Sequence, residues 1–244
     1  LSIQAAELGG YGVSSIIMRH YWRRKNATSG GSMMEKSSHD LDLLSWFAGS
    51  RPVAVNSFGG RLLFRANPML PKKCGECKLS SECRYFSKPV FSSAAGDAIL
   101  DEFYNPDRDS CIYNIVKDVS DNQSVSIRYD NGAIVNFMLG FNCMGPRSGR
   151  NFHAVGTLGR IWGNIEENEL WIYRNSDGKA ERIELPVIES GHNGGNDAHA
   201  LELLKMMRDS SYRPAQDAYA GYLSCTLCIA ADISVREGRQ IRIR

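Results

Sequence analysis

The sequence predicts an α+β fold, in which an open, mostly antiparallel β-sheet has helices packed on one face. Short β-type segments follow one another closely between Ser124 and Leu185, and segments with helical spacing lie before and after them. The tripeptide Asp-Asn-Gly at 130–132 separates two of these segments and favours a tight hairpin, which joins antiparallel strands. Helices that flank such a strand block pack together on one side of the sheet.

The composition is that of an ordinary globular protein. The chain has 244 residues, with 29 basic and 27 acidic side chains, so its formal net charge is +2. This near balance provides no general attraction to nucleic acid or to a membrane surface, and we expect neither as a partner. We find no run of the ~18–20 apolar residues that span a bilayer. We expect residues 1–244 to form one domain with a sizeable core.

The N-terminal segments are predicted from their residue types. Leu1–Leu8 is compatible with the end of a helix, and Val13–Trp22 is rich in β-branched and aromatic residues, which predicts a strand. Met33–Gly49 has apolar residues at helical spacing. Gly49 stands where a C-terminal cap belongs, and Pro52 prevents the helix from continuing.

The middle of the chain changes from irregular to strand-rich. After a strand predicted for Pro52–Phe64, residues 66–110 show no sustained period and carry many Pro, Ser and Cys residues. We expect this irregular insertion to be functional or held by a bound group, because such long loops are unusual within a domain. The strands predicted after it are Val125–Tyr129, Ile134–Phe141, Phe152–Val155, Arg160–Trp162, Leu170–Tyr173 and Arg182–Leu185.

Two helices and a short strand are predicted to close the chain. The first helix begins at residue 196 or 197, where Asn or Asp can cap it, and runs to about 209. The second runs from about 214 to 237, Gly238 ends it, and residues 240–244 form the last strand. Cys225 and Cys228 lie inside this second helix, where one of the two faces the core, so core packing is the expected role of this pair. The apolar residues expected to face the core are Leu201, Leu204 and Met207 in the first helix and Tyr219, Leu223, Leu227 and Ala230 in the second.

The cysteines predict a reducing environment and a metal site. Seven cysteines are too few for a disulfide framework in this length of chain, so we expect a cytoplasmic protein. Cys74 and Cys77, with Cys83 and Cys111, have a spacing that suits a tetrahedral Zn²⁺ site, which would order the insertion. Iron–sulfur ligation uses similar spacings. Free thiols and a local disulfide are the alternatives.

Glu35, His39 and Asp42 form a candidate acid–base site. On a helix, Glu35 and His39 are one turn apart, and Asp42 follows three residues later. Carboxylates on both sides stabilise the charged imidazole and orient its ring, which suits general acid–base chemistry near neutral pH. A surface histidine satisfied by its charged neighbours is the alternative interpretation.

A glycine-rich segment, Gly191 to Asp197, precedes the C-terminal helices. Its backbone N–H groups, beside His192, can bind an anion or a hydroxylated ligand. It lacks the P-loop lysine and the Rossmann spacing. A tight turn with a helix cap is the alternative.

The order and spacing of these motifs resemble the Gfo/Idh/MocA oxidoreductases. A glycine pair, an acidic residue, His39 and then Asp42-Leu43-Leu44 resemble the signature of that family. The resemblance covers nearly the whole chain. Its further segments are Cys111-Ile112-Tyr113, Asp118, Asp121-x-Gln123, Asn131-Gly132, Gly156-Thr157-Leu158-Gly159, Gly191-His192 through Asp197, and Ala230 through Gly238.

The resemblance implies roles for several residues. His39 corresponds to the family's acid–base histidine, which takes a proton from a substrate hydroxyl as hydride leaves the same carbon. Glu35 stands where the family usually has Asp, so its carboxylate reaches one methylene further. Lys36, Asp42 and His192 are implied as substrate-binding residues.

The resemblance also implies a domain organisation. The family has an N-terminal Rossmann domain for NAD(P) and a C-terminal α+β domain that shapes the substrate pocket and often forms the oligomer through its open sheet face. This chain resembles only the second, because it has no Gly-x-Gly-x-x-Gly after a strand and no alternating βαβ pattern. It also starts at Leu1 without Met, so we expect a fragment.

We therefore expect the substrate-binding and oligomerisation domain of an NAD(P)-dependent oxidoreductase that acts on a sugar, a cyclitol or a related molecule. NAD(P) would be bound mainly by the other domain, so the fragment alone would be inactive. Its partners would be a small-molecule substrate and further copies of itself. One alternative is a non-catalytic assembly module stapled by a metal. Another is an NAD-dependent glycosidase of the same superfamily.

Overall fold

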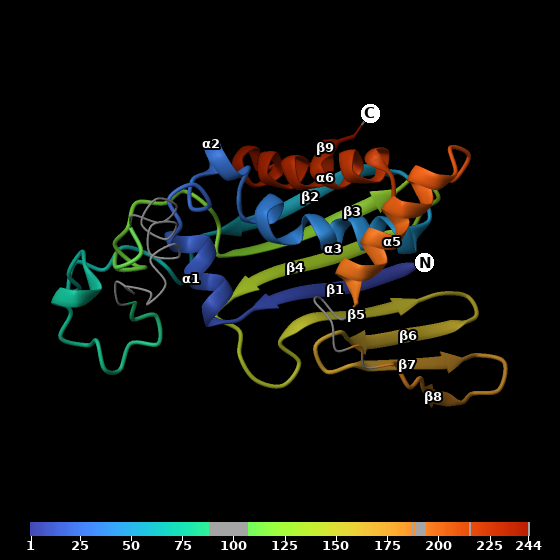
Figure 1. Cartoon of the computed structure of the whole chain (residues 1–244), viewed down its shortest axis with the longest axis horizontal. Coiled ribbons are helices and arrows are strands. Elements are labelled where there is room, and N and C mark those ends of the chain that lie inside the picture. The colour runs from blue at the N-terminus through green and yellow to red at the C-terminus, as the bar shows by residue number, and fades with distance from the viewer. Residues whose placement is uncertain (88–106, 187, 189–193, 215, 244) are drawn as a thin grey trace.

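One open sheet dominates the computed structural model, which describes residues 1–87, 107–186, 188, 194–214 and 216–243 (Figure 1). Nine strands lie in this part of the chain. In chain order they are β1 (Ser2–Gly9), β2 (Pro52–Gly60), β3 (Asn122–Tyr129), β4 (Ile134–Phe141), β5 (Gly149–Val155), β6 (Gly159–Asn164), β7 (Glu169–Arg174), β8 (Ala180–Arg182) and β9 (Ile241–Arg242).

Most neighbouring strands of the sheet run antiparallel. Across the sheet the order is β8-β7-β6-β5-β1-β4-β3-β2-β9. Among the described strands, only β1 and β4 pair in parallel, with Ser2 opposite Ile134. The predicted hairpin joins β3 to β4, and Gly132 in its turn has φ 83°, a conformation that favours glycine. The predicted α+β class is therefore confirmed.

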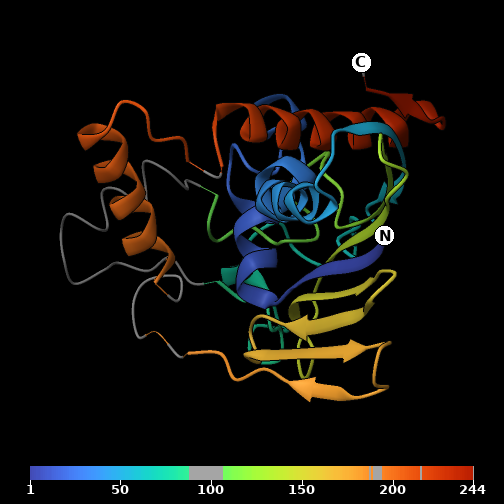
Figure 2. The same cartoon turned by 90° about the vertical axis from the view of Figure 1, so that its right-hand side faces the viewer.

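Helices cover one face of the sheet (Figure 2). The helices of the described part are α1 (Tyr11–Arg19), α2 (Asn26–Ser29), α3 (Ser32–Ala48), α5 (Gly195–Arg208) and α6 (Ala218–Glu237), with a short 3-10 turn, η1, at Cys74–Glu76. α5 stands apart from the sheet in Figure 2, and none of its residues is buried. α3 packs against α6, and α6 also packs against β2. The core lies between these two helices and the strands. Its fully buried side chains include Ile3, Leu41, Val55, Ile127, Val135, Leu139 and Leu227.

The burial pattern of β3 and β4 shows that the other face is open. Along β3, buried and exposed residues alternate strictly, as expected for a strand with one face on the core and one in solvent. In β4, Val135, Phe137 and Leu139 are buried while Ile134 and Met138 are exposed. The open face is therefore defined by the outward residues of β1–β7.

The expectation of a helix at Leu1–Leu8 is wrong. This segment is β1, which lies in the middle of the sheet between β4 and β5. Its Ala and Leu residues have good helix propensity, but backbone hydrogen bonding on both sides outweighs that local preference. Ile3 is fully buried under the helices.

The strand expected at Val13–Trp22 is also wrong, because α1 occupies most of it. Ser14, Ile17 and Met18 are buried, whereas Ile16 is 52% exposed, which is helical spacing. β-branched residues only slightly disfavour a helix, so burying one apolar side decides the conformation. A second, smaller error is at the sheet edge, where β8 shares only Arg182 with the predicted strand.

The three helices predicted later in the chain are confirmed, but their buried faces are not all as expected. α3 ends at Gly49, which has φ 61° as a left-handed C-cap should. In α5 no residue is buried, and Leu201, Leu204 and Met207 are 58%, 44% and 76% exposed. Helical spacing predicts the helix but does not say what its apolar residues pack against.

α6 is long and apolar enough, by length and composition alone, to cross a membrane. Its contacts are those of a core helix, because Leu227, Cys228, Ala230 and Ala231 are buried against the rest of the domain. Tyr219 was expected on this buried side, but it is 56% exposed. Asp217 caps the helix by accepting hydrogen bonds from two backbone N–H groups.

One buried carboxylate anchors the start of the irregular insertion. Asp121 is 2% exposed and accepts backbone hydrogen bonds from Leu62, Leu63 and Phe64 at 2.9, 2.9 and 2.7 Å. These three N–H groups follow the end of β2 and belong to no strand. Asp121 therefore replaces the strand partner that this turn lacks.

We predict that Asp121→Ala destabilises the domain by about 2–4 kcal/mol, because it leaves buried backbone donors without an acceptor. Urea unfolding followed by circular dichroism measures the change. Asp130→Ala is the matched control, since Asp130 is exposed in the hairpin turn. Equal stability of the two variants would contradict this role for Asp121.

Candidate active site

Two glycines place the start of α3 against α6. Gly30 and Gly31 have φ 76° and 92°, and a Cβ added to Gly31 would lie 2.2 Å from Oδ2 of Asp232. Oδ2 of Asp232 also accepts a hydrogen bond from Asn26 at 3.1 Å. The glycine pair is therefore required by both backbone conformation and close approach. It sets where the first turn of α3, with Glu35, begins.

The structure brings Glu35, His39 and Asp42 together on the outer side of α3. Nη1 of Arg23 lies 2.6 Å from Oε1 of Glu35. Partial burial raises the pKa of Glu35, while Arg23 and His39 oppose that rise. Partial burial likewise raises the pKa of Asp42, and His39 again opposes it. His39 is exposed between the two carboxylates, so its imidazole is open to a ligand.

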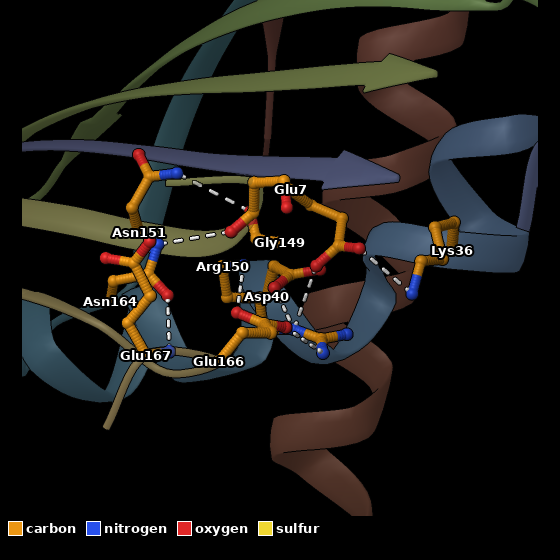
Figure 3. A network of polar contacts seen from close by, with 10 residues as sticks. Glu7, Lys36, Asp40, Gly149, Arg150, Asn151, Asn164, Glu166 and Glu167 are labelled. Carbon is orange, nitrogen blue, oxygen red and sulfur yellow. Dashed lines mark hydrogen bonds and ion pairs between the residues drawn. The ribbon is translucent and has the colours of Figure 1, made fainter. Parts of the chain in front are cut away.

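Lys36 and Asp40 extend inward from the same helix into a network of charges (Figure 3). Nζ of Lys36 lies 3.0 Å from Oε1 of Glu7 in β1. Nε of Arg150 in β5 donates to Oδ1 of Asp40 at 2.8 Å and lies 3.2 Å from Oε2 of Glu7. Glu166, in the turn after β6, accepts a hydrogen bond from the backbone N of Arg150 at 2.5 Å. The network ties α3 to β1 and β5.

Sequence reasoning missed Glu7, Asp40 and Arg150. Glu7 and Asp40 are 3% and 6% exposed, although acidic residues are rarely buried. The local signal for Asp40 is its position four residues after Lys36 on a predicted helix, a spacing typical of a surface pair. Their partners come from strands distant in the sequence.

Of the predicted substrate residues, Lys36 and Asp42 lie beside the candidate acid–base pair, whereas His192 falls outside the described residues. Lys36 is not free, because its ammonium group is paired with Glu7.

The prediction of a metal site at the cysteines is not supported. Cys74, Cys77, Cys83 and Cys111 line one cavity of about 620 Å³, and all four are free thiols. Within the described ranges, no group of three or more His, Cys, Asp or Glu side chains is placed to hold a metal ion. Arg19 gives the physical reason: its buried guanidinium lies among the thiols, with Nη2 3.7 Å from Sγ of Cys74, and a cation there repels a metal ion.

Arg19 also explains how this part of the insertion is ordered. Its Nε donates to the carbonyl of Ser110 at 2.9 Å, and its Nη2 donates to the carbonyl of Tyr85. An isolated antiparallel bridge joins Lys73 to Ser110 next to these contacts. The guanidinium thus fastens two distant stretches of irregular chain to α1.

Among the described residues, the glycine-containing turn between β1 and α1 does not fit a dinucleotide phosphate. The described turn nearest to a phosphate-binding loop is the one between β1 and α1, with glycines at 9, 10 and 12. A phosphate would need open space against these glycines. At Gly10 the side chain of Met144 fills that space, since its Sδ lies 2.7 Å from where a Cβ on Gly10 would be.

Comparison with known proteins is consistent with this geometry. Residues 15–243 match the model of an oxidoreductase family, in its C-terminal alpha/beta domain. A Bacillus subtilis (strain 168) protein named "Putative oxidoreductase YteT" is 30% identical over 218 residues, which are 77% of this chain and 49% of that protein. The chain therefore spans about half the length of this relative.

Solved structures show the same fold at low sequence identity. Levoglucosan dehydrogenase, in complex with NADH and levoglucosan, has a TM-score of 0.70 at 16% identity, over all of this chain and 58% of that one. An oxidoreductase domain protein from Kribbella flavida has a TM-score of 0.71 at 14% identity, over 100% of this chain and 59% of that one. A "putative myo-inositol dehydrogenase" from Sinorhizobium meliloti 1021 has a TM-score of 0.55 at 15% identity, over 100% of this chain and 56% of that one.

We predict that Cys225 and Cys228 react very differently with iodoacetamide. Cys225 is exposed, whereas Cys228 is fully buried and burial strongly raises the pKa of its thiol. Because the thiolate is the reactive form, Cys225 should alkylate at least about a hundredfold faster. Peptide mass spectrometry of the native protein over time measures both rates, and similar rates would contradict the assigned core role of Cys228.

Proposed function

Because the chain belongs to the Gfo/Idh/MocA oxidoreductase family, as its C-terminal alpha/beta domain, we propose that it is the substrate-binding part of an NAD(P)-dependent dehydrogenase of a sugar, a cyclitol or a related hydroxylated molecule. The observation that carries the proposal is the exposed His39 on α3 with a carboxylate one turn away on each side. Relatives of the same fold include proteins named for levoglucosan and myo-inositol.

In this proposal His39 accepts the proton of the substrate hydroxyl that is oxidised. Imidazole suits the task because its ordinary pKa lies near neutral pH. Glu35 and Asp42 stabilise the imidazolium that forms, and Arg23 holds Glu35 in place through its 2.6 Å ion pair. Lys36, which is paired with Glu7, is proposed to bind a second oxygen of the substrate when that ion pair opens.

NAD(P) is proposed to be bound by a part of the longer protein that this chain does not include. Support comes from the length of the relatives, which is about twice the part matched here, and from the NADH complex of levoglucosan dehydrogenase. Apolar side chains about two turns beyond His39 on α3 suit contact with such a part. Trp46 and Phe47 on α3 are 59% and 38% exposed, and their rings stack at 5.6 Å.

We predict that His39→Ala in the full-length enzyme lowers kcat by about 10²–10⁴-fold, the usual contribution of a general base. NAD⁺ reduction at 340 nm with a panel of sugars and cyclitols, levoglucosan and myo-inositol included, measures it. His153→Ala is the matched control, because His153 lies opposite the exposed Gln4, on the face of the sheet that α3 does not cover. Unchanged turnover in His39→Ala would instead favour a non-catalytic assembly domain.

We also propose that the domain forms a homo-oligomer through its open sheet face. Phe58 and Met138 are 73% and 42% exposed there, and Ser124 pairs with both across the strands. On the same sheet, Trp162 and Trp171 are cross-strand neighbours whose rings stack at 5.9 Å. Apolar and aromatic surface of this kind is enriched at protein interfaces.

Phe58→Asp is therefore expected to convert the oligomer into a smaller species, because it places a charge in the contact. Size-exclusion chromatography with light scattering gives the molar mass. Met69→Asp is the control, since Met69 is 88% exposed in the irregular insertion. The same mass in both variants would contradict an interface on the open face.

A further inference from the structure

Two buried carboxylates compete for one donor where α3 meets the sheet. Nε of Arg150 is within hydrogen-bond distance of Asp40 and within ion-pair distance of Glu7, but its hydrogen bond goes to Asp40. Oε2 of Glu7 and Oδ2 of Asp40 are buried, and neither accepts a hydrogen bond from any described residue. A buried acceptor left without a donor costs free energy. These buried carboxylates therefore lack a hydrogen-bond donor.

The charges at this point do not balance either. Glu7, Asp40 and Glu166 carry three negative charges, and Arg150 and Lys36 supply two positive ones. Glu166 is 44% exposed, so water screens it, whereas the other two carboxylates are buried.

The remaining groups that face Asp40 add no positive charge. From α6, the buried Cys228 approaches Asp40, and burial keeps its thiol protonated. From α3 itself, Lys36 is committed to Glu7. From β5, Arg150 is the guanidinium already counted. A proton is therefore the simplest group that supplies the missing donor and removes the excess charge.

We propose that Glu7 and Asp40 hold a single proton between them in mildly acidic solution, and that this proton controls how firmly Glu7 holds Lys36. When Asp40 is ionised, Arg150 is committed to Asp40, and Glu7 relies on Lys36. When Asp40 is protonated, the positive charge of Arg150 turns to Glu7. Glu7 then needs Lys36 less, and the ammonium group of Lys36 becomes available to an anionic group on a ligand.

The electrostatics of Asp40 agree with this geometry. Burial raises the pKa of Asp40 to about 6, Arg150 opposes the rise, and Glu7 adds to it. Since this value lies above the ordinary 3.8, protonated Asp40 favours the folded state. The stability contributed by this group is fully present below pH 3.8 and is lost as the pH rises to about 6.

The consequence for chemistry lies at Lys36. Lys36 follows Glu35 directly and is three residues before His39, so its charge is next to the candidate acid–base pair. When Lys36 leaves Glu7, its ammonium charge is no longer neutralised by that carboxylate. The electrostatic potential beside Glu35 and His39 then becomes more positive. The inference rests on the proposed function only where it names a substrate as the ligand of Lys36. The proton shared by Glu7 and Asp40 does not depend on the proposed function.

The first experiment measures the proton. Unfolding free energy is determined by urea denaturation from pH 4 to pH 7 for the wild-type chain, Asp40→Asn and the control Asp130→Asn, whose side chain is exposed in the hairpin turn. Between these pH values the wild type should lose about a hundredfold in folding constant relative to Asp40→Asn, because the variant has no carboxyl group to titrate. Asp130→Asn should follow the wild type. Parallel curves for all three proteins overturn the proposal.

The second experiment measures the link to Lys36. Trace acetylation with acetic anhydride at pH 8, read by peptide mass spectrometry, reports the reactivity of the Lys36 amine. In Asp40→Asn, which mimics the protonated state, Lys36 should react about three- to tenfold faster than in the wild type, because its ion pair with Glu7 is weaker. Lys205, which is paired with Glu202 on α5, is the internal reference. An unchanged rate for Lys36 overturns the link.

Glu7→Gln provides a second route in case Asp40→Asn does not fold. Removing the charge of Glu7 takes away both the like-charge neighbour of Asp40 and the partner of Lys36. We expect a smaller loss of stability between pH 4 and pH 7 and faster acetylation of Lys36. A full-sized loss, or an unchanged rate, contradicts the proposal. Neither experiment uses enzymatic turnover. A failed activity assay therefore contradicts the proposed function but not this inference, and a failed proton or acetylation experiment contradicts this inference but not the proposed function.

Discussion

The ion pair between Arg150 and Asp40 fixes α3 against the middle of the sheet. It joins a helix of the N-terminal third to β5, more than a hundred residues later, and the shared contact with Glu7 brings in β1. A helix that packs only through apolar side chains can rotate slightly about its axis, whereas directional charge contacts on one side define its rotation. The outward position of Glu35, His39 and Asp42 follows from that rotation. The site thus depends on residues that do not belong to it.

Much of the fold could be predicted because the relevant signals are local. Alternation of polar and apolar residues gives β3 and β4, the Asp-Asn-Gly turn gives their hairpin, and Gly49 gives the end of α3. β1 and α1 could not be predicted in this way. β1 is a strand because its backbone pairs with a neighbouring strand on each side. α1 is a helix because one of its sides is buried against the rest of the domain. Neither contact can be inferred from the residues of the segment itself.

The candidate site divides along the same line. Glu35, His39 and Asp42 lie within two turns of one helix, so their spacing alone places them together. Glu7 and Arg150 reach the same helix through sheet pairing, and no spacing relates them to Asp40. For the cysteines, by contrast, the spacing predicts a site that the structure does not support. Their spacing is that of a metal site, but spacing does not reveal that the guanidinium of Arg19 lines the same cavity, 3.7 Å from Sγ of Cys74.

That guanidinium holds the described part of the insertion through a cation that belongs to the chain itself. A structural zinc ion must be acquired from the cell and can be removed by a chelator, and the loop around it then unfolds. A cation carried by the chain's own side chain is present from synthesis onward and cannot be lost by dilution. The contacts of Arg19 with Ser110 and Tyr85 therefore form without any trace element from the cell.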